Sequence, residues 1–298
     1  MNSFTFIYII GVFIILNLFQ GFTNISLENQ LIYSSILILL LGIPHGAIDH
    51  VLFFKKRKMS QLKFYSLYLG LSFLFVILWH IFPVTSLILF LLISAFHFGE
   101  SQFADIFFKK SLRFIFYFFW GLCLLSTLMY YNVNELYEIT SYFDDTIILD
   151  KIYNKEKIGV FFYITNAVTI LSIIALTYFK KINNDRLFSE LFLLFLIHAT
   201  FYLFPFIIGF TLYFVALHSI KVMNDEFKFL KDEDNNFSIV SFLKLLAPYS
   251  ILSIIGTSFL LILSYYNLIP YSIPFLAIII ISVITLPHAI VMNIFYNE

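Results

Sequence analysis

The stretch LIYSSILILLLGIPHGAIDHVLFF, residues 31–54, is apolar over most of its length and decides the environment in which the chain folds. A helix needs about 20 mainly apolar residues to cross the hydrocarbon layer of a bilayer, and this stretch is long enough. Its second half nevertheless contains His45, Asp49 and His50. Ionisable side chains are costly within a membrane and usually face a bundle interior or a cavity, so they indicate a functional site.

The whole chain has the composition of a membrane protein. Of its 298 residues, 61% are hydrophobic and 12% are charged, and 40 are phenylalanine. Soluble domains are nearer half apolar and a quarter charged, so no soluble fold of this length buries that much apolar surface. The formal net charge is zero, which gives no reason to expect a nucleic-acid partner. Cys123 is the single cysteine and cannot form a disulfide within one chain.

Apolar runs separated by charged or proline-containing turns predict an all-α, polytopic integral membrane helix bundle of about ten transmembrane helices, within a range of eight to ten. The N-terminal run lacks a basic start and a small-residue cleavage site, so it is interpreted as the first span and not as a signal peptide. Residues 1–298 are interpreted as a single transmembrane domain. The predicted spans are 4–22, 31–54, 64–82, 84–108, 112–131, 158–179, 187–204, 206–223, 245–267 and 273–296.

The charges of the loops predict an orientation. Segments 55–63, 109–113 and 180–186 are basic, whereas the loop 132–157 carries six acidic residues against three lysines. Short basic loops stay on the cytoplasmic side. With ten spans, we expect a multi-pass protein of the inner (plasma) membrane with both termini cytoplasmic. The mixed loop 224–238 then also lies inside.

All seven histidines fall inside predicted spans. Counted from the cytoplasmic end of each span, His45 lies nine residues in, His97 eleven, His218 five and His288 eight. At 1.5 Å per residue, these four lie in one layer roughly 8 to 16 Å from the inner boundary. Helix bundles commonly build metal sites from side chains on facing helices, and neutral imidazole is the commonest metal ligand. Imidazole suits iron, copper, nickel and zinc alike, so the ligand type does not select the metal.

Carboxylates and prolines accompany these histidines. Asp49 follows His45 by four residues and Glu100 follows His97 by three, so each pair is expected on one helix face. A carboxylate placed there can accept the second N–H of a ligating imidazole. Pro44 and Pro287 directly precede two of the histidines, and we expect each to kink its helix.

The remaining histidines have plainer interpretations. His80 and His198 lie in the outer parts of their spans, where a histidine is expected to form hydrogen bonds between helices. His50 follows His45 by five residues and is therefore expected on a different face of the helix. It is either a residue at the inner boundary of the membrane or a hydrogen-bond partner of a metal-ligating side chain.

Four short motifs resemble the signature regions of the Brp/Blh family of bacterial and archaeal membrane proteins. They are GIPHGAIDH, SAFHFGE, YFVALHS and TLPHAIVMNIFY, in the same order along nearly the whole chain. The resemblance implies a β-carotene 15,15'-dioxygenase, which splits the central double bond of β-carotene with O2 to give two retinal molecules. It also implies Fe(II) held by histidines and retinal passed on to a rhodopsin.

The resemblance assigns ligand roles residue by residue. His45 and His97 match proposed iron ligands, and His218 matches the first histidine of the family's HSxxH pattern. The chain departs from that pattern at Val222, where the family has a second histidine. His288 is a candidate to complete the site, or the iron keeps fewer protein ligands. The departure at Val222 leaves open whether the activity is retained, altered or lost. Asp49 and Glu100 are expected to act in catalysis by orienting the ligands.

Two other function classes compete with this prediction. A membrane di-iron desaturase or hydroxylase needs clusters such as HxxxH and HxxHH, and no two histidines here are four residues apart. A transporter with a buried His, Asp and Glu site for metal ions or protons is the main alternative on physical grounds. Transporters of that kind are typically built from inverted repeats, and no clear repeat is found in this sequence.

Overall fold

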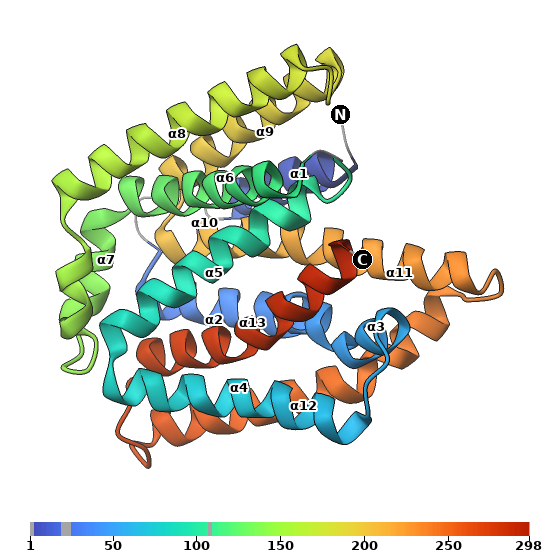
Figure 1. Ribbon diagram of the computed structural model, residues 1–298. Helices are drawn as coiled ribbons and strands as arrows, with labels where there is room; N and C mark the ends of the chain where they lie inside the picture. The colour runs from blue at the N-terminus through green and yellow to red at the C-terminus, as the bar shows by residue number, and fades with distance from the viewer. Residues whose placement is uncertain (1–2, 19–24, 107–108, 298) are drawn as a thin grey trace. The chain divides into compact units, whose positions relative to one another are not determined.

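The computed structural model describes residues 3–18, 25–106 and 109–297, and every regular element within them is a helix (Figure 1). The elements are α1 (Ser3–Leu18), α2 (Leu27–Leu37), η1 (Ile38–Gly42), η2 (Ile43–Gly46), α3 (Asp49–Lys56), α4 (Gln61–Ile81), α5 (Pro83–Phe103), α6 (Lys110–Tyr131), α7 (Val133–Ser141), η3 (Ile147–Ile152), α8 (Lys155–Tyr178), α9 (Asn184–Leu203), α10 (Phe206–Leu212), η4 (Tyr213–Ser219), α11 (Ile220–Glu233), α12 (Ile239–Tyr265) and α13 (Ile273–Asn297).

The expected all-α membrane fold is confirmed. Within the described residues, nine helices are long and apolar enough to cross a membrane, and α1 is a shorter apolar helix at the position of the first predicted span. The predicted bounds are close to the observed ones, as in the span 64–82, which is α4. Parts of two predicted spans, 19–22 and 107–108, lie outside the described residues.

Polar residues in the connecting segments determine where several helices begin. The side chains of Ser60, Asn154, Asn183 and Ser238 accept hydrogen bonds from backbone N–H groups in the first turns of α4, α8, α9 and α12. Serine and asparagine are favoured at this position because their oxygen satisfies an N–H group that has no partner within the helix. These capping residues therefore separate one span from the next.

The chain forms two compact units, which we describe separately. Helix α5 contributes its second half to unit 1 and its first half to unit 2. Unit 1 comprises Met1–Gly42, Ala95–Ile139 and Tyr153–Val222, and unit 2 comprises Ile43–Ser94, Thr140–Ile152 and Met223–Glu298.

In unit 1, helix α6 packs against both α8 and α9 (Figure 1). Its crossing with the second half of α5 is very close, because a Cβ atom at Gly121 would overlap the carbonyl oxygen of Ala95. Similarly, a Cβ atom at Gly99 would overlap the carbonyl oxygen of Tyr117. Glycine permits such backbone contacts between membrane helices, which gain stability from van der Waals packing. This crossing fixes the turn of α5 that carries His97.

In unit 2, helix α13 packs against α3, α4 and α12 (Figure 1). Two hydrogen bonds join α4 to α13. The indole N–H of Trp79 donates to Ser282 Oγ at 2.7 Å, and the hydroxyl of Ser72 lies 3.3 Å from the carbonyl oxygen of Val283. Buried Trp79 therefore has its polar atom satisfied, as an apolar environment requires.

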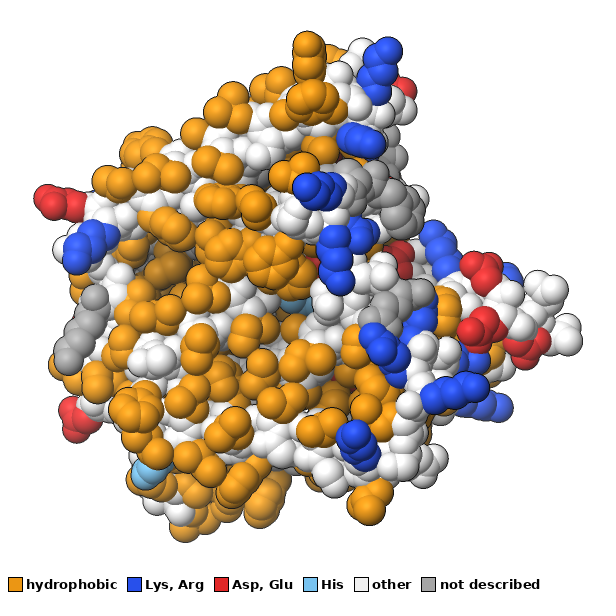
Figure 2. Space-filling model, viewed as in Figure 1, with side chains coloured by type: hydrophobic (Ala, Val, Ile, Leu, Met, Phe, Trp, Pro, Cys, Tyr) orange, Lys and Arg blue, Asp and Glu red, His pale blue; other side chains and the backbone are white. Residues whose placement is uncertain are grey.

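Both units expose extensive apolar surface. Figure 2 shows hydrophobic side chains covering the visible parts of α8 in unit 1 and of α4 in unit 2. Large side chains are largely exposed there, such as Leu171 of α8 at 65% and Phe73 of α4 at 68%. Soluble monomers rarely expose continuous apolar surface of this kind, whereas lipid-facing helices require it.

Two predictions about local structure need correction. The predicted loop 224–238 is mostly helical, since α11 continues to Glu233 and buries Glu226 completely. The predicted loop 132–157 contains helix α7 and the short helix η3. Pro287 lies within α13, which continues as a helix on both sides of it.

The close crossing of α5 and α6 predicts that Gly121→Ala destabilises the protein. The added methyl group has to displace the backbone of α5, which typically costs about 1–3 kcal/mol. We expect a lower thermal unfolding temperature in detergent. Gly70→Ala is the control, because nothing lies within 4 Å of a Cβ atom there. That substitution is expected to be neutral or to stabilise α4 by up to about 1 kcal/mol. Equal shifts for both variants would contradict the described crossing.

Glu135 of α7 lies outside the spanning helices and predicts a pH dependence of stability. Its carboxylate accepts a hydrogen bond from the backbone N–H of Phe206 at 2.6 Å. Burial raises the pKa of Glu135 above its ordinary value, and this hydrogen bond offsets the shift only in part. Between the ordinary and the raised pKa the folded chain binds more protons than the unfolded chain, so stability falls as the pH rises through that window.

We therefore expect Glu135→Gln to flatten the dependence of the unfolding temperature on pH in this window. The amide oxygen of glutamine can still accept the hydrogen bond from Phe206, so the helix start is retained. Thermal unfolding over a pH series checks this expectation. Glu28, which is exposed on α2, supplies the control variant Glu28→Gln. If the unfolding temperature of Glu135→Gln depends on pH as steeply as that of the unchanged protein, Glu135 is not the source of the pH dependence.

Candidate metal centre

Two of the four candidate ligands lie in segments that are not regular α-helix. His45 is in η2, a 3-10 turn that follows the π-helix η1, and His218 is in the π-helix η4. Within unit 1, η1 and η4 pack against each other, and a Cβ atom at Gly42 would lie only 2.8 Å from the ring of Phe214. π-Helical segments are rare and frequently occur at functional sites.

In unit 2, the structure brings His45 and His288 together. Their ring centroids are 4.7 Å apart, and the ring planes are nearly perpendicular at 87°. Both side chains are buried. Gly46 makes the approach possible, since a Cβ atom there would lie 3.2 Å from His288 Nδ1. The glycine directly after His45 therefore leaves room for the second imidazole.

Asp49 connects this pair to α4. Its Oδ1 lies 2.8 Å from His288 Nδ1, and its Oδ2 accepts a hydrogen bond of 2.8 Å from the hydroxyl of Tyr68. Asp49 is 3% exposed, so each carboxylate oxygen is satisfied by a protein donor instead of by water. A carboxylate beside Nδ1 keeps the proton on that atom and leaves the lone pair on Nε2, the arrangement of many metal-ligating histidines.

The partner of Asp49 was predicted from helical spacing to be His45, and the structure gives His288 instead. The residues from Ile43 to Ile48 form a 3-10 turn followed by a bend of the chain, so the rule that residues four apart share one face does not apply. The contribution of Tyr68 was not predicted at all. It comes from a neighbouring helix, and an isolated tyrosine in an apolar span gives no sequence signal.

In unit 1, the structure brings His97 and His218 together. Their ring centroids are 4.8 Å apart at an interplanar angle of 80°, and each residue is 1% exposed. His218 also contacts the edge-on ring of Phe98 and stacks on Phe214. Ser101 Oγ lies 3.1 Å from His218 Nδ1. This contact joins residues that are far apart in the sequence and is a result of the fold.

The end of α5 that carries His97 is held by three other helices. The carbonyl oxygens of its last residues accept hydrogen bonds from Lys221 of α11, from Arg186 of α9 and from Tyr117 of α6. The last carbonyl groups of a helix have no partner within it, and cationic side chains stabilise this negative end. The position of His97 therefore depends on side chains far away in the sequence.

The other predicted polar residues are placed as follows. Glu100 is fully buried on α5, one turn after His97. His50 is half-buried, and its ring packs against Tyr249 at 4.5 Å. His80 Nδ1 is 2.9 Å from the hydroxyl of Tyr271, and His198 Nε2 is 2.8 Å from Asn166 Oδ1. His198 thus joins α9 to α8, as expected from its position, whereas the partner of His80 lies in the segment between α12 and α13 and not in a helix.

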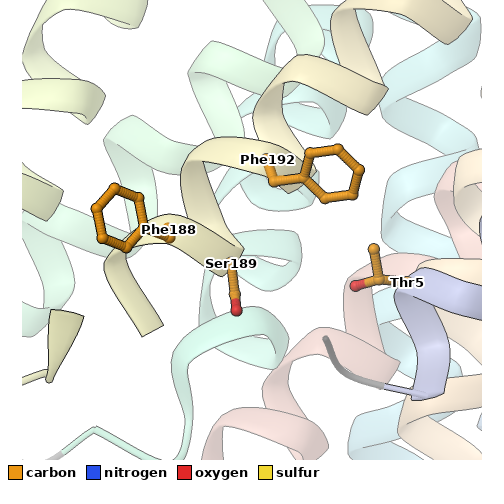
Figure 3. Close-up of a pocket in the computed structure, with 4 residues that line it drawn as sticks. All are labelled: Thr5, Phe188, Ser189 and Phe192. Atoms are coloured by element: carbon orange, nitrogen blue, oxygen red, sulfur yellow. The ribbon is translucent and has the colours of Figure 1, made fainter. Parts of the chain in front are cut away.

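A pocket in unit 1 is distinct from the histidine pairs. It has a volume of about 200 Å³ and lies between α1 and α9, lined by Thr5, Phe188, Ser189 and Phe192 (Figure 3). Its lining contains no group with acid–base, nucleophilic or metal-binding chemistry apart from two hydroxyls. We therefore do not assign a catalytic role to it.

The chain belongs to the family described as beta-carotene 15,15'-dioxygenase, which matches residues 36–296. This match confirms the resemblance that was based on the four motifs, all of which lie inside it. A relative from the uncultured marine bacterium 66A03, named beta-carotene 15,15'-dioxygenase, is 38% identical over 72 residues. That alignment covers 22% of this chain and 26% of the relative, so it spans about a quarter of the relative's length. No solved structure gives a significant match.

The Tyr68–Asp49–His288 chain predicts how metal affinity responds to substitution. Asp49→Asn removes the charge that holds the Nδ1 proton of His288, and loss of such a partner typically weakens metal binding about 10–100-fold. Tyr68→Phe is expected to have a smaller effect in the same direction. Titration of the purified protein with Fe(II) under anaerobic conditions measures both.

Matched controls exist in the same unit. Asp145→Asn alters a carboxylate that accepts from the backbone N–H of Ser272, and Tyr271→Phe removes a hydroxyl that contacts His80. Neither variant is expected to change the affinity for Fe(II). An Asp49→Asn protein that binds the metal as tightly as the unchanged protein would contradict the role given to Asp49.

Proposed function

We propose that this chain is an iron-dependent oxygenase that cleaves β-carotene at its central 15,15' double bond with O2 and forms two molecules of retinal. Four buried imidazoles, placed by the four family motifs, carry the proposal. His45 and His288 adjoin each other in unit 2, and His97 and His218 adjoin each other in unit 1. Family membership supports the class of reaction.

The proposal assigns His45, His97, His218 and His288 as ligands of Fe(II). The donor set fits this metal, because imidazole nitrogen is a suitable ligand for iron. When bound, Fe(II) supplies the redox-active centre with open coordination positions that O2 needs in order to react with an alkene. This chain has Val222 at the position of the second histidine in the HSxxH pattern, and Val222 is fully buried and has no ligand atom. His288 is proposed to supply the missing ligand.

The chain's own residues prepare the site in three ways. The imidazoles are nearly inaccessible to solvent, which keeps water away from the reacting groups. Asp49 holds the ring of His288 in one orientation. Glu100, buried one turn after His97, is proposed to orient a ligand in unit 1 in the same way. The apolar outer surface of the helices gives a carotenoid dissolved in the bilayer access to the protein.

The cellular setting follows from the same proposal. The protein is placed in the inner (plasma) membrane with both termini cytoplasmic, because its short basic loops then obey the positive-inside rule. A carotenoid is delivered by lateral diffusion in the lipid bilayer, and retinal is released into the same bilayer. A rhodopsin in that membrane is the expected recipient, and no nucleic acid is involved.

The central test is expression of the chain in a bacterium that accumulates β-carotene, followed by extraction and chromatography of the pigments. We expect β-carotene to decrease and retinal to appear, with two retinal molecules for each carotene consumed. The products of His45→Ala and His97→Ala cells are expected to contain no retinal, because each variant removes an iron ligand. His288→Ala tests in the same way whether this residue completes the site.

His198→Ala and His80→Ala are the controls, since each removes an imidazole whose hydrogen-bond partner, Asn166 or Tyr271, lies outside the two pairs. Both are expected to retain retinal formation. Unchanged β-carotene, with the protein shown to be in the membrane, would contradict the proposed substrate. Retinal formation by both His45→Ala and His97→Ala would contradict the ligand assignment.

A further inference from the structure

The hydroxyl group of Ser101 lies between the backbone of α5 and the ring of His218. Ser101 Oγ is 3.0 Å from the carbonyl oxygen of Phe98 and 3.1 Å from His218 Nδ1. A serine hydroxyl has one hydrogen, and a carbonyl oxygen can only accept. When the hydroxyl donates to Phe98, its oxygen is free to accept a hydrogen bond from the imidazole. In that arrangement Nδ1 carries the proton and the lone pair lies on Nε2.

We propose that Ser101 is a positioning residue that holds His218 as the Nδ1–H tautomer and so presents Nε2 as the metal-donor atom. The proposed tautomer is argued only from contacts within unit 1, whereas the donor role rests on the proposed function. Ser101 is 3% exposed, so water does not compete for its oxygen. One residue thus does for His218 what Asp49 does for His288.

Both ends of this contact are fixed by the surrounding side chains. The carbonyl oxygen of Ser101 accepts a hydrogen bond from Lys221, which follows His218 by three residues on the same continuous helix. α5 is therefore joined to this helix at two points, one through the side chain of Ser101 and one through its backbone. The rings of Phe98 and Phe214 enclose the imidazole from two sides. The orientation of His218 is accordingly set before any metal binds.

The two supported imidazoles are not equivalent. His288 faces a carboxylate, and a hydrogen bond to an ionised acceptor is roughly twice as strong as a neutral one. His218 faces a neutral hydroxyl, which raises the basicity of the ring less. We therefore expect His218 to be the weaker donor, and loss of Ser101 to weaken metal binding less than loss of the carboxylate of Asp49.

The experiment reads the tautomer in the metal-free protein. Nitrogen-15 spectra of histidine-labelled protein distinguish a protonated ring nitrogen from one that carries a lone pair, and His218→Gln identifies the signals of His218. We expect the unchanged protein to show the Nδ1–H form. Ser101→Ala should lose this preference, whereas Ser101→Thr keeps a hydroxyl that can bond the carbonyl of the preceding turn and should restore it.

Ser126→Ala is the matched control. Ser126 is also buried and donates to the carbonyl three residues before it, yet its other contact is Thr165 and not a histidine. This variant should leave the His218 signals and metal binding unchanged. A Ser101→Ala protein in which His218 still shows the Nδ1–H form would overturn the proposal.

Anaerobic titration with Fe(II) then tests the donor role separately. We expect Ser101→Ala to bind Fe(II) about tenfold more weakly than the unchanged protein, with Ser126→Ala unaffected. A tautomer change without any change in affinity would overturn the assignment of Nε2 as a donor. An unchanged protein that binds no Fe(II) would instead contradict the proposed function, while the tautomer result would still decide the role of Ser101.

Discussion

Imidazole and carboxylate groups are buried in this protein among helices whose other side chains are mainly hydrocarbon. Burial of a polar group costs several kcal/mol of free energy unless protein atoms replace its hydrogen bonds to water. This constraint shapes the surroundings of the histidines. Asp49 shows the result most clearly, because both of its oxygens are engaged, one by His288 and the other by Tyr68. Helices α3, α4 and α13 must pack together for that arrangement to exist.

The same constraint explains why irregular helix occurs beside the histidines. A regular α-helix satisfies its own backbone, whereas π and 3-10 turns change the direction of side chains at the cost of poorer hydrogen bonds. η4 turns His218 toward His97 and Ser101, and η2 places His45 against His288. Local distortion of the backbone thus accompanies the placement of the ring nitrogens.

Glycine and cationic side chains hold the turn of α5 that carries His97. Gly99 and Gly121 let α5 and α6 approach until their backbones touch, so the turn of His97 has little freedom to shift. Lys221 and Arg186 hold the carbonyl groups at the end of the same helix. Gly121, Arg186 and Lys221 lie outside the histidine motifs, yet they contribute to the position of His97.

The sequence by itself determined the membrane class and the approximate bounds of the helices, and it singled out the histidines that form the two buried pairs. Apolar runs of a length set by the bilayer, and histidines within them, are signals that depend only on local composition. Partnerships between side chains were decided by the tertiary structure. Spacing suggested His45 for Asp49, but the chain around Pro44 is not α-helical, and α13 brings His288 to the carboxylate instead. Tyr68, Ser101 and Lys221 acquire their roles because packing brings distant helices together, and no local pattern in the sequence encodes such contacts.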